Sequence, residues 1–226
     1  MSALLRDVSV RVRGLPEPVI DVPDLAIATG EHLAVTGPSG AGKTTLLNIL
    51  TGLERPVSGA VLWDGIDIAR LSEAKRDTWR AKQVGIIMQD FNLFPGLSAL
   101  DNVLLPRQLR VPRLGNDARE RARHLLEQVG LNRHDQKVET MSRGEMQRVA
   151  VARALQAQPA IIVADEPTAS LDDTSAKRIT DLLIGLSTSS AATLIVVTHD
   201  QTLARAMHRV VSLQRGRIVG SRTAPT

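Results

Sequence analysis

The sequence contains no cysteine and no tyrosine, and aromatic residues make up only 2% of it. The absence of cysteine excludes a disulfide framework and a thiolate metal site, and it is typical of a cytosolic protein. The scarcity of aromatic side chains argues against a surface on which nucleic-acid bases stack. Two common classes, the disulfide-rich secreted protein and the base-stacking nucleic-acid binder, are therefore disfavoured at the outset.

Long hydrophobic runs are also lacking. The longest apolar stretches, such as residues 191–198, are far too short to cross a bilayer. Residues 1–14 alternate apolar and charged side chains, whereas a signal peptide has a continuous apolar core. We therefore predict a soluble chain that contacts a membrane only through a partner.

Charge of neither sign dominates the sequence. The 28 lysines and arginines stand against 24 aspartates and glutamates, and the two signs are interspersed along the chain. We interpret the small basic excess as solvated surface and expect no direct contact with nucleic acid. With 226 residues, 43% of them hydrophobic, the chain is long enough and apolar enough for a buried core.

Apolar strand patterns alternate with helical patterns along the chain. Strands are predicted near residues 4–13, 24–28, 32–37, 59–65, 160–165 and 193–200, helices over 43–53 and 117–131, and a terminal hairpin over 209–221. This order is typical of a parallel, layered α/β domain. No repeat or linker interrupts it, so we predict a single domain over residues 4–226.

One glycine-rich segment, "GPSGAGKTT", matches the phosphate-binding pattern G-x-x-x-x-G-K-[ST] between a predicted strand and a predicted helix. Its glycines let successive N–H groups point at phosphate oxygens, and the helix N-terminus adds partial positive charge. The alternative, a glycine-rich turn without a ligand, does not require this context. The segment predicts a Mg²⁺-dependent nucleoside triphosphate site formed by Gly37, Pro38, Ser39, Gly40, Ala41, Gly42, Lys43, Thr44 and Thr45, with Lys43 on the β- and γ-phosphates and Thr44 on Mg²⁺.

Polar side chains follow two other apolar strands. Asp165 and Glu166 end the strand "AIIVAD", and a strand-end aspartate in phosphate-binding-loop enzymes holds magnesium. Neighbouring side chains of a strand point to opposite sides, so Glu166 is free to polarise the attacking water. His199 follows "TLIVVT" and is a candidate to contact the γ-phosphate and orient that water. The alternatives are an exposed glutamate after the strand and a structural histidine.

With these motifs in order, the chain resembles the nucleotide-binding subunit of an ATP-binding cassette (ABC) transporter. The likeness runs from about residue 4 to about residue 220 and is carried by "GPSGAGKTTLLNILTGLERPVSG", "VGIIMQDFNLFPGLSALDNVLLP" and "DEPTASLD". It is greatest for the branch of lipoprotein-releasing and macrolide-exporting ATPases. The resemblance implies a P-loop NTPase with a RecA-like core, an N-terminal antiparallel β subdomain and a helical signature subdomain over about 85–160, between the Walker A and Walker B motifs.

The resemblance also implies roles for Gln89 and Asp172. Gln89, in "IIMQD", matches the glutamine that reaches magnesium beside the membrane partner. Asp172, in "SLDD", matches the loop aspartate that crosses to the other subunit. Without the family context, Gln89 would be interpreted as an ordinary polar residue after a strand.

The segment "MSRGE", residues 141–145, stands where the family has its signature, typically LSGGQ or LSGGE. Ser142 and Glu145 also form the pattern S-x-x-E of a helix capping box, and the two interpretations are compatible. The resemblance implies that Ser142 and Gly144 meet the γ-phosphate bound by a second copy, so that two cassettes enclose two nucleotides. Arg143 departs from the family, which has glycine at this position. Two alternatives stay open on the sequence: the arginine aids phosphate binding electrostatically, or it crowds the interface between the two copies.

The function that the resemblance implies is ATP binding and hydrolysis that power a transmembrane permease. It implies a homodimer or paired cassettes, with ATP and Mg²⁺ as cofactors, on the cytoplasmic, inner face of the plasma membrane. Two alternatives stay open on the sequence: an ABC ATPase acting on nucleic acid or the ribosome, and an ATP-gated scaffold with little hydrolysis. The aromatic that stacks adenine in this family is absent, since Val12 or Arg13 occupies its position. We therefore expect weak base discrimination, unless Arg13 stacks on the base in place of the aromatic.

Overall fold

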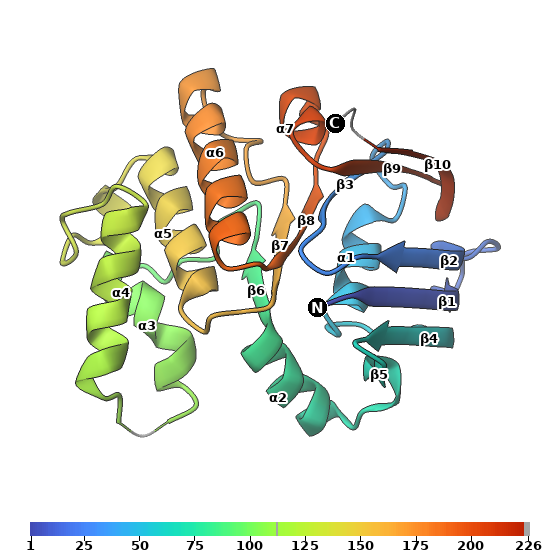
Figure 1. Cartoon of the computed structure of the whole chain (residues 1–226), viewed down its shortest axis with the longest axis horizontal. Helices are drawn as coiled ribbons and strands as arrows, with labels where there is room; N and C mark the ends of the chain where they lie inside the picture. Colours follow the sequence, from blue (N-terminus) through green and yellow to red (C-terminus); the bar gives the residue numbers. More distant parts are fainter. Residues whose placement is uncertain (112, 224–226) are drawn as a thin grey trace.

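The computed structural model describes residues 1–111 and 113–223, which fold around two β-sheets (Figure 1). The smaller sheet is antiparallel, has the strand order β2-β1-β4-β5, and contains β1 Ala3–Val10, β2 Ile20–Ile27, β4 Ser58–Trp63 and β5 Ile66–Asp67. The larger sheet has the order β10-β9-β3-β8-β7-β6 and contains β3 His32–Thr36, β6 Val84–Ile87, β7 Ile161–Asp165, β8 Thr193–Val197, β9 Arg209–Gln214 and β10 Arg217–Thr223. All its pairings are parallel except that of the terminal hairpin, β9 with β10.

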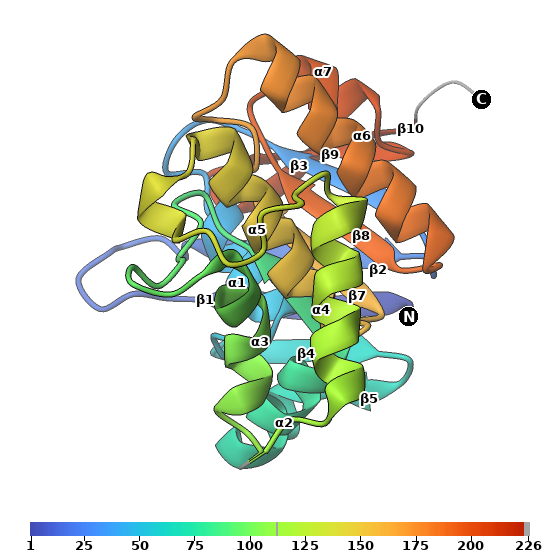
Figure 2. The same ribbon diagram turned by 90° about the vertical axis from the view of Figure 1, so that its left-hand side faces the viewer.

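Helices cover both faces of the larger sheet. They are α1 Lys43–Leu50, α2 Glu73–Gln83, α3 Ala99–Gln108, α4 Asn116–Gln128, α5 Arg143–Leu155, α6 Asp173–Ser189 and α7 Gln201–Arg205. Figures 1 and 2 show α3, α4 and α5 gathered on one side of the molecule and α1 lying toward the antiparallel sheet. Within the described part of the chain, no helix has both the length and the apolar character needed to span a bilayer.

Two hydrophobic cores meet at the larger sheet. In β3, Leu33 and Val35 pack into the core shared with α1 and the antiparallel sheet, whereas Ala34 packs into the core shared with α3 to α6. Residues of β7 and β8 divide between the two cores in the same way. Because both faces are covered, every residue of β7 and β8 is buried and most are apolar, whereas β1 has both buried and exposed positions. The layered α/β fold is confirmed.

The helical region begins later than the residue near 85 expected from the sequence. That boundary lies inside β6, whose residues Val84–Ile87 pair in parallel with Ile161–Ala164 of β7. The four residues of β6 are too few for their pattern to distinguish a buried strand from the start of a helix. The helices α3, α4 and α5 follow, and β7 returns the chain to the sheet at Ile161.

A buried histidine at the start of β3 predicts acid-sensitive stability. The His32 side chain is buried, its ring stacks on that of His208 with centroids 4.4 Å apart, and its Nε2 lies 3.1 Å from the Ser187 hydroxyl. Burial, followed by the charge of His208, lowers the pKa of His32 below its ordinary value of 6.5. The unfolded state therefore binds more protons, and stability should fall as the pH drops below about 6.5, by at most about 1.4 kcal/mol per pH unit from this residue.

Urea unfolding at pH 7.5 and pH 5.5 measures this effect. His32→Gln, which stays uncharged, should reduce the loss of stability between the two pH values, whatever its effect at pH 7.5. His124→Gln, on an exposed face of α4, is the matched control and should keep the wild-type loss. Equal losses in all three proteins would contradict the role of His32.

Candidate functional site

The glycine-rich loop connects β3 to α1 and depends on glycine at two close approaches. Gly37 and Gly42 have φ angles of 153° and 97°. A Cβ at Gly37 would lie 2.1 Å from the backbone oxygen of Leu213, and one at Gly42 would lie 2.6 Å from that of Val19. The terminal hairpin and the loop before β2 therefore press directly on this turn, and larger residues are excluded from both positions.

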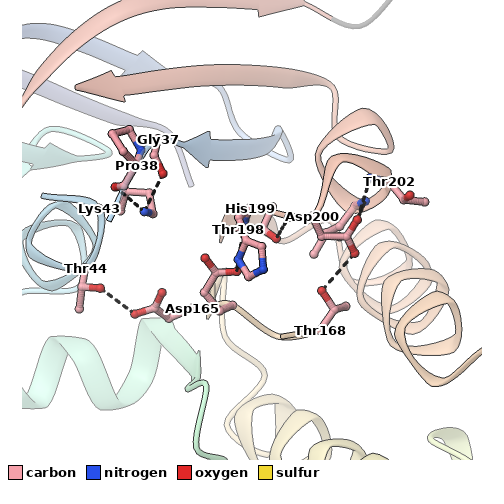
Figure 3. A network of polar contacts seen from close by, with 12 residues as sticks. Gly37, Pro38, Lys43, Thr44, Asp165, Thr168, Thr198, His199, Asp200 and Thr202 are labelled. Atoms are coloured by element: carbon pink, nitrogen blue, oxygen red, sulfur yellow. Dashed lines mark hydrogen bonds and ion pairs between the residues drawn. The ribbon is translucent and has the colours of Figure 1, made fainter. Parts of the chain in front are cut away.

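Lys43 begins α1 and folds back over the loop (Figure 3). Its Nζ donates hydrogen bonds to the backbone oxygens of Gly37, at 2.9 Å, and of Pro38, at 3.0 Å. A lysine ammonium held at the mouth of a loop of backbone N–H groups is the arrangement that binds the β- and γ-phosphates of a nucleotide.

Thr44 and Asp165 place two oxygen atoms side by side next to this loop. The Thr44 hydroxyl donates to Oδ2 of Asp165 at 3.0 Å (Figure 3). Asp165 ends β7 and is only 9% exposed. Burial raises the pKa of its carboxyl, as does the charge of Glu166, while the Thr44 hydrogen bond and Lys43 act in the opposite direction.

These two residues fit a Mg²⁺ ion. Magnesium prefers hard oxygen ligands, and it commonly keeps several waters while using one or two protein groups. Gln89 follows β6, the neighbour of β7, and its side chain is exposed at the same carboxyl edge of the sheet. Within residues 1–111 and 113–223, the side-chain amide of Gln89 forms no hydrogen bond with another residue. A third oxygen is thus free at this edge.

Glu166 and His199 are brought together although they are far apart in the sequence. Nδ1 of His199 lies 2.8 Å from Oε2 of Glu166, and the backbone N–H of His199 donates to the same oxygen at 3.2 Å. The two residues follow the adjacent strands β7 and β8. The Glu166 side chain is 14% exposed and that of His199 is 70% exposed, so the pair opens to solvent on the histidine side. A carboxylate held against an imidazole can accept a proton from a water molecule.

Thr168, Thr198 and Asp200 form a hydrogen-bonded group in the segments that follow β7 and β8, and sequence reasoning missed them. The Thr168 hydroxyl donates to the Asp200 carboxylate at 3.2 Å, and the backbone N–H of Asp200 donates to the Thr198 hydroxyl at 3.0 Å (Figure 3). Asp200 also caps α7 by accepting from the N–H of Thr202. The available signal was Asp200 two residues before Thr202 at a predicted strand end, a pattern typical of a helix start.

Ser142, Gly144 and Asp172 form a separate edge, at the N-termini of α5 and α6. Ser142 makes the predicted capping box: its hydroxyl accepts from the N–H of Glu145 and donates to the Glu145 carboxylate, at 3.3 and 2.9 Å. Asp172 caps α6 by accepting from the N–H of Ser175, and a Cβ on Gly144 would lie 3.3 Å from the Ser175 hydroxyl.

No hydrogen bond or ion pair joins this edge to the group around Lys43 in the described part of the chain. The structure therefore assembles the Lys43, Thr44, Asp165, Glu166 and His199 group in one place. Ser142 and Asp172 are exposed to solvent at the separate edge formed by the N-termini of α5 and α6. A buried residue missed by sequence reasoning, Gln147, links the two parts, because its amide donates to the backbone oxygen of Pro167 at 2.9 Å.

Comparisons with known proteins identify the family of this chain. Residues 20–169 match the family described as ABC transporter. The lipoprotein-releasing system ATP-binding protein LolD of Syntrophus aciditrophicus is 46% identical over 198 residues, covering 87% of this chain and 88% of that protein. LolD of Pseudomonas fluorescens is 43% identical over 218 residues, covering 95% of each.

Solved structures give the same result. The ATP-binding cassette MJ0796, in a dimeric post-hydrolysis state with ADP and Pi bound, superposes with a TM-score of 0.90 at 34% identity and 99% coverage of both chains. The family predicted from the sequence is thereby confirmed. The chain belongs to the ABC transporter family, in which it is an ATP-binding and ATP-hydrolysing subunit.

Proposed function

We propose that this chain is the ATPase of a lipoprotein-releasing system and acts as a pair of cassettes on a transmembrane permease, at the inner face of the plasma membrane. The observation that carries the proposal is the identity of 43–46% with proteins named as lipoprotein-releasing ATPases over 87–95% of the chain. The dimeric state of the similar cassette MJ0796 supports the pairing. One ABC domain spans residues 4–226, with its helical signature subdomain between Walker A and Walker B.

The site residues then divide their work between two copies. The loop of residues 37–45 binds the triphosphate, with Lys43 on the β- and γ-phosphates. Thr44, Asp165 and Gln89 would hold Mg²⁺, and the bound ion would supply positive charge beside the phosphate oxygens. Glu166 polarises the attacking water, and His199 orients it against the γ-phosphate. Ser142 and Gly144 of the second copy close the pocket, and Asp172 contacts the neighbouring subunit.

The Glu166–His199 pair favours hydrolysis over the alternative of a scaffold that only binds ATP. At 2.8 Å the two groups are in hydrogen-bond contact, and the carboxylate has a second donor in the His199 N–H. This pairing holds the glutamate side chain in one place before a nucleotide enters. An acceptor fixed in advance loses less freedom at the moment of reaction than a mobile one.

Steady-state phosphate release from the full chain, with and without its permease in detergent, tests the proposed function. We expect hydrolysis that depends on Mg²⁺, with a rate that rises when the permease is added. Capture experiments should recover a membrane protein. Recovery of RNA or ribosomes in its place, or no hydrolysis under either condition, would contradict the proposal.

The base site lacks an aromatic platform, which predicts weak base discrimination. Val12 is 49% exposed in the loop after β1, and no tyrosine exists in the chain. Base–aromatic stacking contributes about 1–3 kcal/mol per base in nucleic-acid complexes, so its loss should weaken ATP binding by about 5- to 150-fold. ATP and GTP should then be hydrolysed at similar rates. A strong preference for ATP in parallel phosphate-release assays would refute this prediction.

A further inference from the structure

Arg143 departs from the signature pattern of the family, and the structure shows where its side chain lies. It occupies the first position of α5, directly between Ser142 and Gly144. Its guanidinium carbon lies 5.3 Å from the centroid of the Phe91 ring in the same chain. Among residues 1–111 and 113–223, no carboxylate forms an ion pair with this arginine. The Arg143 guanidinium thus lies over the ring of Phe91.

Phe91 is a fixed platform rather than a mobile surface side chain. It is only 7% exposed, and it belongs to the segment that follows Gln89. Its backbone and that of Asn92 have φ angles of 61° and 48°, a conformation that non-glycine residues seldom adopt. Arg153, also on α5, holds this turn by donating to the backbone oxygens of both residues, at 2.6 Å to Phe91.

The contact determines what the signature edge presents to a second copy. An unrestrained arginine is long and charged, and it would cover the serine and glycine between which it stands. A guanidinium over an aromatic face within about 6 Å of the centroid is attracted by the ring. The Phe91 ring thus draws the arginine toward the segment after Gln89 in its own chain, and Ser142 stays exposed.

We infer that Phe91 is a positioning residue that holds Arg143 away from the shared nucleotide pocket, and so allows this chain to carry arginine where the family has glycine. The inference rests on the proposed function, in which residues 142 and 144 meet the nucleotide of a second copy. It assigns Phe91 no contact with ATP. Phe91 should affect ATP-driven dimerisation only through residue 143, and this dependence can be measured.

ATP-driven dimerisation of the full chain measures how far the effect of Phe91 depends on residue 143. All variants carry Glu166→Gln so that bound ATP persists, and sedimentation at increasing ATP gives the concentration for half-maximal dimer. Phe91→Leu should raise that concentration by about 2- to 30-fold in the chain that keeps Arg143, the range expected for a lost cation–π contact. In a chain that also carries Arg143→Gly, the same change should have less than about a 2-fold effect. Arg143→Gly alone should dimerise like the parent.

Phe94→Leu is the matched control, since Phe94 lies on the same segment but is 53% exposed, and Arg143 lies over the ring of Phe91 instead. Phe94→Leu should change the ATP concentration for half-maximal dimer equally in the chain that keeps Arg143 and in the chain that carries Arg143→Gly. An equal effect of Phe91→Leu in the chain that keeps Arg143 and in the chain that carries Arg143→Gly would overturn the inference, because Phe91 would then be purely structural. Loss of dimerisation in Arg143→Gly alone would also overturn it, by giving the arginine a direct role. A Glu166→Gln parent that never dimerises with ATP would contradict the proposed function itself.

Discussion

Replacing Glu166 with glutamine is expected to slow ATP turnover by about 10²–10⁴-fold, the range for loss of a general base. The amide keeps the size of the side chain but cannot take a proton from water. ATP binding should persist, because the phosphate-binding groups, Lys43 and the loop of residues 37–42, are untouched. Steady-state phosphate release measures the rate, and titration with a fluorescent ATP analogue measures the binding.

The matched control is Glu127→Gln, an equal chemical change on the exposed face of α4, away from β7 and β8. It should hydrolyse ATP like the wild type. Wild-type turnover in Glu166→Gln would remove the glutamate from its proposed role, and weak nucleotide binding in that variant would indicate a structural one.

The parts of the fold that the sequence predicted are those fixed by local pattern. The runs "AIIVAD" and "TLIVVT" have uninterrupted apolar centres because β7 and β8 are covered on both faces. The phosphate-binding loop is a contiguous motif whose glycines, lysine and threonine all lie within nine residues of sequence. Its position between β3 and α1 was therefore predictable.

The parts that sequence could not supply are contacts between distant segments. Glu166 and His199 are 33 positions apart and meet because β7 lies beside β8, a pairing that no local pattern encodes. The same holds for Arg143 over Phe91, where the first residue of α5 meets the turn that follows Gln89. For this reason the departure at Arg143 was visible in the sequence while its partner was not.

A second large effect is expected at Gly144, where aspartate should separate nucleotide binding from pairing. An aspartate there adds a carboxylate at the edge proposed to meet the γ-phosphate of the second copy. Like charges brought together at an interface cost several kcal/mol, so ATP-driven dimerisation in the Glu166→Gln background should weaken by about 10²–10³-fold. ATP binding by the single cassette should be unchanged, because its own loop and Lys43 lie in the other group of residues.

Local stability supports this interpretation of the variant. A carboxylate in the first turn of α5 interacts favourably with the helix dipole, so Gly144→Asp should not lower the melting temperature. Gly144→Ala is the control: its Cβ would lie 3.3 Å from the Ser175 hydroxyl, the end of a side chain that can rotate, and dimerisation should stay within a few-fold of the parent. If Gly144→Asp paired as well as Gly144→Ala, residue 144 would not face a phosphate. The pocket would then have to be completed by other residues of the second copy or by none.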